Sequence, residues 1–182
     1  MRKPLAAAGT AAFFALAPGL VAGLGPWWLT GWRERHPPYW LPLRVAGWVV
    51  LAAGVVVLVH AFSRFALEGS GTPAPVAPTQ QLVVRGPYRY VRNPMYLAVV
   101  AAIVGQALVL GRPAVLGYAA AAGAAMTAFT RGYEEPTLRR QFGADYEAYR
   151  HAVPAWRPRL HPWHPGEAGR RGRCRSPGRR WR

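Results

Sequence analysis

The sequence contains few cysteine, lysine or acidic residues. Its one cysteine, Cys174, excludes a disulfide framework or a cysteine-based metal site within the chain. Eight residues follow Cys174, so it does not form a C-terminal prenylation box either. The five histidines show no helical i, i+4 pair. We therefore predict no metal site.

Positive charge is carried almost entirely by arginine. The chain has 23 basic residues, of which only Lys3 is a lysine, against seven acids, and its net charge is +16. Seven arginines lie in the last 13 residues, and most of the others flank apolar blocks. Arginines beside apolar blocks are the topology signal of membrane proteins, so we predict no nucleic-acid binding. The preference for arginine is typical of a GC-rich bacterial genome.

Apolar residues occur in long blocks, which predicts an all-α, polytopic membrane bundle. Hydrophobic residues make up 52% of the chain and charged residues 16%. The blocks are long enough for about four transmembrane helices. The predicted spans are about 5–29, 43–67, 95–110 and 113–130. The first begins like a signal peptide, but it continues past Pro18 to two tryptophans, which favours a retained span.

The third and fourth spans are separated only by Gly111 and Arg112, which predicts a tight antiparallel hairpin. The fourth span is rich in alanine and glycine and is predicted to pack inside the bundle. Four spans place both termini on one side. The arginine-rich loop before residue 95 and the C-terminal region make that side cytoplasmic, and the bacterial inner membrane is the predicted location.

The region after the fourth span changes character. The segment "EEPTLRRQFGADYEAYRHA" predicts a cytoplasmic, amphipathic helix pair whose apolar face carries Leu138, Phe142, Tyr146 and Tyr149. Residues 161–182 are rich in proline, glycine and arginine, which predicts a disordered tail after a membrane domain of residues 1–160. Earlier in the chain, "QQLVVRGPYRY" predicts a short strand and turn on the membrane surface.

The hairpin brings two polar segments, "RYVRNPMY" and "GYEEP", to the same membrane face. Asn93 precedes Pro94 and is predicted to cap the third span with its side chain. Arg92 and this helix N-terminus favour an anion, whereas Glu134 and Glu135 favour a cation. Together they predict a site for a zwitterionic ligand. The alternatives are a solvated ion-pair network and a common helix start with an arginine reaching to the interface.

Three motifs in order, "GPYRYVRNPMYLA", "LGRPA" and "EEPTLRRQFGADYEAYRHAVPAWRPR", resemble the isoprenylcysteine carboxyl methyltransferase family and related phospholipid methyltransferase-like membrane proteins. The resemblance implies in-line methyl transfer from S-adenosylmethionine to a lipophilic, membrane-associated acceptor. It implies Arg92 and Glu135 as catalytic residues. The residues that it implies for cofactor binding are Arg92, Asn93, Pro94, Tyr96, Tyr133, Glu134 and Glu135.

Substrate contacts are predicted at Arg89, which suits an acidic substrate group, and at His60. His60 either lines the ligand cavity or simply faces neighbouring helices. Many members of the family carry histidine at the position of Asn93, and asparagine cannot titrate near neutrality, which argues against a general base there.

Two other functions remain open from the sequence. One is a nicotinamide-dependent membrane reductase of the sterol-reductase type, and the other is a non-enzymatic scaffold that binds membrane lipids. The sequence does not identify the methyl acceptor. A carboxylate, thiol or amine on a lipid, quinone or peptide would each suit a site at a membrane face, and the oligomeric state is equally open.

Overall fold

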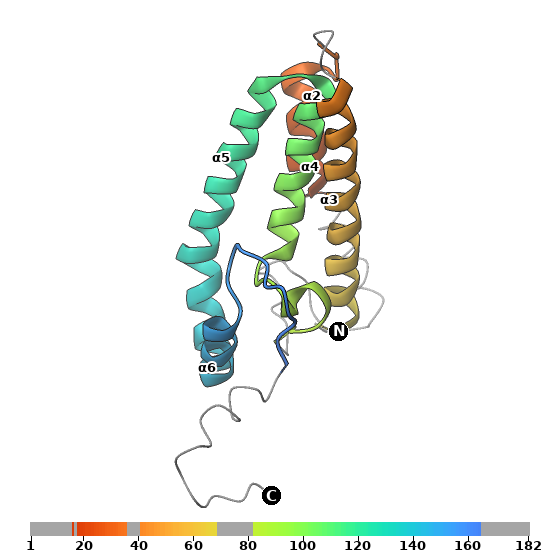
Figure 1. Ribbon diagram of the computed structural model, residues 1–182. Coiled ribbons are helices and arrows are strands. Elements are labelled where there is room, and N and C mark those ends of the chain that lie inside the picture. The colour runs from red at the N-terminus through yellow and green to blue at the C-terminus, as the bar shows by residue number, and fades with distance from the viewer. Residues whose placement is uncertain (1–15, 17, 36–40, 69–81, 165–182) are drawn as a thin grey trace, which may run out of the picture.

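The protein is all-helical over the part of the chain that the computed structural model describes, which is residues 16, 18–35, 41–68 and 82–164, with only the backbone at 65–68 (Figure 1). The elements in order are η1 Gly19–Leu24, α2 Gly25–Thr30, α3 Leu41–Glu68, η2 Gly86–Arg89, α4 Pro94–Leu110, α5 Pro113–Phe129, η3 Thr130–Glu134 and α6 Glu135–Ala152. No strand forms within these ranges, so the predicted short strand is wrong where it is described. There, Gly86–Arg89 makes a 3-10 turn.

Three predicted spans agree with α3, α4 and α5 to within about two residues. Of the first predicted span, the structure describes Leu16 and the stretch from Pro18 onward, and the rest lies outside the described residues. Among those residues, two helical runs are long and apolar enough to cross a membrane, Leu41–Arg64 and Pro113–Ala152. Helix α4 is apolar but shorter. Exposed valines along α3 suit contact with lipid rather than water.

The hairpin between α4 and α5 forms as predicted. Gly111 ends α4 in the left-handed conformation, with φ of 64°, and its N–H donates to the carbonyl of Ala107. Pro113 then starts α5, where its missing N–H leaves no helical hydrogen bond unmade. As a result, the beginning of α4 and the end of α5 lie at the same end of the bundle (Figure 1).

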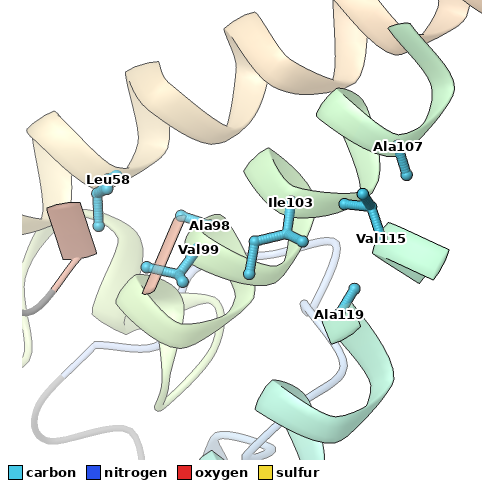
Figure 2. Close-up of a cluster of buried hydrophobic side chains, with 7 residues drawn as sticks. All are labelled: Leu58, Ala98, Val99, Ile103, Ala107, Val115 and Ala119. Carbon is cyan, nitrogen blue, oxygen red and sulfur yellow. The ribbon is translucent and has the colours of Figure 1, made fainter. Parts of the chain in front are cut away.

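Helix α4 is the central helix. Nine of its residues are buried, against two of α5. The core cluster shown in Figure 2 joins α3, α4 and α5 and consists of Leu58, Ala98, Val99, Ile103, Ala107, Val115 and Ala119. The prediction that the fourth span packs inside the bundle is therefore wrong. Helix α5 contributes one contact face, and the rest of its alanine-rich surface is exposed.

The close approach of small residues occurs instead between α3 and α4. A Cβ atom added at Gly105 would lie 2.6 Å from the backbone nitrogen of Leu51. One added at Gly54 would lie 2.9 Å from the carbonyl oxygen of Ala98, and one at Gly47 would lie 2.8 Å from the backbone nitrogen of Val109. Only glycine permits such backbone contact, which is the way small residues hold membrane helices together.

The first helical segment is fastened to the bundle by two polar side chains. Gln106 of α4 donates a hydrogen bond of 2.6 Å to the carbonyl of Ala22, and the Tyr118 hydroxyl of α5 donates one of 2.8 Å to the carbonyl of Val21. Both acceptors lie in the π-helical η1. This pairing places η1 against the hairpin.

Helix α5 continues through η3 into α6, which bends sharply at Gly143, with φ of 50°. The predicted helix pair is thus two helices joined at that glycine. Its apolar face packs as one cluster in which Tyr146 and Tyr149 are buried with Val153 and Trp163. Leu138 and Phe142 pack against them.

Residues 153–164 form an irregular segment, here called the C-terminal strap, which returns from α6 toward the beginning of α4 (blue in Figure 1). Trp163 is buried, and its N–H donates to the carbonyl of Arg89 at 3.0 Å. The packed chain therefore extends beyond residue 160, where the tail was predicted to begin. Residues 165–182, with Cys174, lie outside the described residues.

The α3–α4 contact predicts that the same glycine-to-alanine substitution changes stability differently at two positions. Gly105→Ala should destabilise the protein by about 1–3 kcal/mol, because the added methyl group overlaps the backbone of α3. Gly117→Ala on α5, where nothing lies within 4 Å, should be neutral or stabilising. Thermal unfolding in detergent measures both. Equal effects of the two variants would contradict the packing described here.

Candidate functional site

The candidate site lies where the C-terminal strap pairs with the loop that enters α4. Three main-chain hydrogen bonds join them: Arg92 N to Pro154 O at 2.9 Å, Arg159 N to Tyr90 O at 2.9 Å, and Trp163 N to Arg89 O at 3.0 Å. These bonds hold the loop in register beside the start of α6. The loop, the strap and α6 together therefore surround the N-terminal end of α4.

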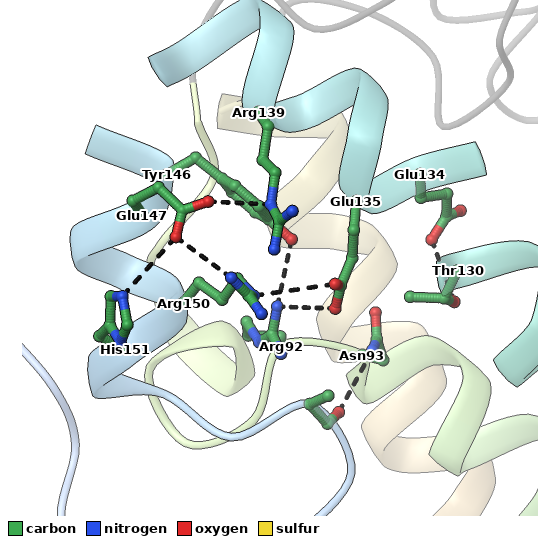
Figure 3. Close-up of polar contacts among 11 residues, drawn as sticks. Arg92, Asn93, Thr130, Glu134, Glu135, Arg139, Tyr146, Glu147, Arg150 and His151 are labelled. Atoms are coloured by element: carbon green, nitrogen blue, oxygen red, sulfur yellow. Dashed lines mark hydrogen bonds and ion pairs between the residues drawn. The ribbon is translucent and has the colours of Figure 1, made fainter. Parts of the chain in front are cut away.

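A largely buried ion pair joins α6 to this loop. Nη1 of Arg92 donates to Oε1 of Glu135 at 2.9 Å, and the two side chains are 12% and 15% exposed. The same Nη1 donates to the Tyr146 hydroxyl oxygen at 3.1 Å (Figure 3). Arg150 approaches the second oxygen of Glu135 at 3.8 Å. Nε of Arg92 is buried and has no hydrogen-bond acceptor among the described residues.

The neighbouring carboxylate, Glu134, is held from the opposite side. The Tyr96 hydroxyl donates to its Oε1 at 2.5 Å, and the Thr130 hydroxyl donates to its Oε2 at 3.3 Å. Burial raises the pKa of the Glu134 carboxyl, while the hydrogen bonds from Tyr96 and Thr130 lower it in part. Glu134 lies beyond the end of α5, so this group sits at the end of the bundle.

Arg92, Glu134 and Glu135 border one cavity of about 90 Å³. Its polar lining is formed by Tyr88, Arg92, Asn93, Thr130, Glu134, Glu135, Tyr146 and Tyr149, and its apolar lining by Leu82, Val83 and Leu138. The predicted meeting of Arg92–Tyr96 with the acidic doublet is therefore confirmed by direct contacts, Arg92 with Glu135 and Tyr96 with Glu134. The functional roles of these residues stay predictions.

Asn93 behaves differently from its prediction. Its side chain makes no capping bond to α4, so the predicted side-chain cap is wrong. Nδ2 donates instead to the carbonyl of Ala155 in the strap at 3.2 Å. Pro94 does start the helix, as predicted, and is buried. A cap would accept from the N–H groups of the second or third helical residue, which Pro94 at the first position leaves in place, but the Asn93 side chain is engaged by the strap instead.

Pro94 and Tyr96 do not line the cavity itself. Three further predicted site residues do not line it either. Tyr133 is 44% exposed and stacks on Phe129, with 5.3 Å between ring centroids. Nε of Arg89 donates to the carbonyl of Trp163 at 2.8 Å. His60 is exposed on α3, and its Nε2 would lie 3.2 Å from a Cβ atom at Gly86. All three nevertheless belong to segments at this end of the bundle.

Four polar residues of the lining were not predicted as site residues. Packing was the favoured prediction for Tyr146 and Tyr149, yet Tyr146 accepts from Arg92, and the Tyr149 hydroxyl donates to the carbonyl of Tyr88 at 2.6 Å. Tyr88 is itself buried, and burial raises its pKa, so it remains a neutral phenol. Thr130 is the fourth. The placement of Tyr146 and Tyr149 on the face of α6 with Leu138 was a signal that they turn inward.

A second set of ion pairs on α6 is more exposed. Glu147 lies 2.8 Å from Arg139 and 3.2 Å from Arg150, and His151 approaches it at 3.7 Å (Figure 3). The Arg139 and Glu147 side chains are 42% and 38% exposed, so solvent screens their attraction. The exposed Arg139–Glu147 pair therefore serves as a control for the buried Arg92–Glu135 pair.

Residues 43–145, more than half of the chain, match the family model described as phospholipid methyltransferase. No curated protein and no solved structure matches the chain. The matched range contains most of α3, the α4–α5 hairpin, the Arg92–Asn93 corner and both glutamates. The family match confirms the resemblance to phospholipid methyltransferase-like membrane proteins.

The buried pair predicts strong energetic coupling. In a double-mutant cycle with Arg92→Gln and Glu135→Gln, we expect a coupling energy of about 2 kcal/mol or more, because either single variant leaves a charge poorly solvated. The Arg139→Gln and Glu147→Gln cycle should give less than about 1 kcal/mol. Denaturant unfolding in detergent measures both cycles. Similar values for the two would show that the Arg92–Glu135 contact is solvated.

Proposed function

Because the chain belongs to the phospholipid methyltransferase family, we propose that it is a membrane methyltransferase that uses S-adenosylmethionine and acts on a lipophilic acceptor. The single observation that carries the proposal is the Arg92–Glu135 pair at the cavity, since it offers both signs of charge to one small ligand. The match of the chain to this family favours methyl transfer over a nicotinamide-dependent reductase or a scaffold.

The donor set fits the proposed cofactor. S-adenosylmethionine carries a carboxylate, an ammonium group and a sulfonium group. Arg92 suits the carboxylate, and its Nε is buried without an acceptor. Glu135 suits a cationic group, and Glu134 with Tyr96 provides a second negative site close by. Asn93 and Pro94 shape the corner that presents Arg92. Tyr133 and Tyr96 remain the candidates for the adenosine.

Side chains must move for this ligand to enter. The cavity of about 90 Å³ is far smaller than the roughly 300–1,000 Å³ typical of sites for small-molecule ligands. We infer that the ligand opens the Arg92–Glu135 contact. Its carboxylate then replaces Glu135 as the partner of Arg92, and its cationic group replaces Arg92 as the partner of Glu135. In the free protein the pair therefore keeps two largely buried charges satisfied until the ligand replaces them.

When bound, the cofactor supplies an electrophilic methyl group together with its leaving group. The part of the protein is then to bind, to align and to exclude water. Arg92 and Glu135 fix the orientation, and the buried tyrosines Tyr88 and Tyr149 close the inner side of the cavity. Asn93 holds the strap through Ala155 and moves no proton.

The acceptor is proposed to reach the site from the membrane. On the four-span topology with cytoplasmic termini, the cavity lies at the cytoplasmic face, where a lipid tail stays in the bilayer while its polar end enters. Arg89 and His60 are the candidates to contact that polar end, since η2 and the end of α3 lie together near Gly86. A carboxylate, thiol or amine nucleophile fits this arrangement.

Ligand binding tests the proposal. Detergent-purified protein should bind S-adenosylmethionine, and Glu135→Gln or Arg92→Gln should weaken binding at least about tenfold, because each removes a charged hydrogen-bond partner. Glu147→Gln, which removes an exposed carboxylate of the same helix, should leave affinity unchanged. Calorimetric titration with S-adenosylmethionine and with NADPH measures this.

Binding of NADPH alone, or equal losses in Glu135→Gln and Glu147→Gln, would refute the assignment. If the expected pattern is seen, incubating host membranes with methyl-labelled S-adenosylmethionine and identifying the labelled product names the acceptor.

A further inference from the structure

Two arginines beside the site have buried donor groups without acceptors. Nε of Arg89 is used by the carbonyl of Trp163, but Nη2 of Arg89 is buried and unbonded among the described residues. Nη1 of Arg159 is likewise buried without an acceptor in the described part of the chain. A buried donor without an acceptor costs about 1–3 kcal/mol and more when it is charged, so the arrangement favours a ligand that accepts hydrogen bonds.

The surrounding segments supply no counter-charge. Residues 82–93 and the C-terminal strap, 153–164, contain no aspartate or glutamate in their sequence. They carry five arginines, Arg85, Arg89, Arg92, Arg157 and Arg159. Of these five, only Arg92 forms an ion pair within the described structure. Because guanidinium groups stay protonated at any physiological pH, these two segments carry an excess of positive charge that favours an anionic ligand.

The main-chain pairing brings Arg89 and Arg159 to facing segments. Arg159 N donates to Tyr90 O, and Trp163 N donates to Arg89 O, so Arg159 lies opposite the residue that follows Arg89 on the loop. Neither arginine lines the cavity described above. The location is therefore separate from the proposed cofactor site but rests on the same strap.

An apolar side chain adjoins these cations. Leu160, which follows Arg159 directly, is 93% exposed, and Tyr90 on the facing loop is also exposed. A small anion would bind the arginines but would leave the leucine exposed to water. A lipid would satisfy both, because its headgroup carries the negative charge and its acyl chains cover the leucine.

We propose that Arg89 and Arg159 bind the phosphate group of an anionic membrane phospholipid, with Leu160 in contact with its acyl chains. Phosphate oxygens accept the bonds that Nη2 of Arg89 and Nη1 of Arg159 leave unmade. The bound lipid fastens the strap to the loop. Since the strap also holds Arg92 and Asn93 through Pro154 and Ala155, the lipid stabilises the corner that shapes the cavity.

The test measures lipid retention without the methyl donor. Native mass spectrometry of the purified full chain, titrated with phosphatidylglycerol or with phosphatidylcholine, reports the occupancy of each lipid. Arg159→Gln is the main variant, because the Arg159 side chain makes no hydrogen bond within the described structure and its loss should not unfold the protein. Arg157→Gln is the matched control, since it removes an exposed arginine of the same strap.

Phosphatidylglycerol should be retained in preference to phosphatidylcholine, and Arg159→Gln should weaken its binding about tenfold while Arg157→Gln changes it less than about twofold. Equal losses of phosphatidylglycerol binding in the two variants would show that net charge alone explains the binding, and would overturn the proposed site. Equal retention of the two lipids would also overturn it. Displacement of the lipid by millimolar inorganic phosphate would assign the site to a soluble anion instead. Because no donor is added, failure here leaves the methyltransferase assignment untouched.

Discussion

The contact between Arg92 and Glu135 joins two parts of the chain that the fold must hold together. Arg92 lies on the loop that enters α4, and Glu135 begins α6 after the helical run has left the bundle. The pair is largely buried, so it persists only because both charges have partners: Tyr146 and Glu135 for the arginine, and Arg92 and Arg150 for the carboxylate. A site that satisfies itself in this way is prepared for a ligand that carries both charges.

The packing of the helices serves this contact. Glycines let α3 and α4 touch backbone to backbone, which fixes α4 as the central helix. The turn at Gly111 then returns α5 to the same end of the bundle. The strap completes the enclosure, because its main chain pairs with the loop at three points. Each of these elements limits where the two glutamates can lie relative to the beginning of α4.

Much of this arrangement could be predicted from local signals. Apolar length and the Gly-Arg-Pro turn gave α3, α4, α5 and their hairpin, and the hairpin alone required Arg92 and Glu135 to be neighbours. What failed depended on tertiary context. Composition does not show which helix rich in small residues is central, so α5 was wrongly predicted to lie inside the bundle, where α4 lies instead. Asn93 lost its capping role because the strap, distant in sequence, supplied a carbonyl. Tyr146 and Tyr149 turn inward to Arg92 and to the carbonyl of Tyr88, which lie on a loop distant in sequence.

The central claim is that one zwitterionic ligand replaces the internal ion pair. Determining the structure of the protein by electron cryomicroscopy with and without S-adenosylhomocysteine, the product form of the cofactor, tests it most directly. The account predicts that Arg92 and Glu135 touch each other in the free protein, and that in the complex they separate and contact opposite charges of the ligand. A ligand bound elsewhere while the Arg92–Glu135 contact stays intact would contradict it.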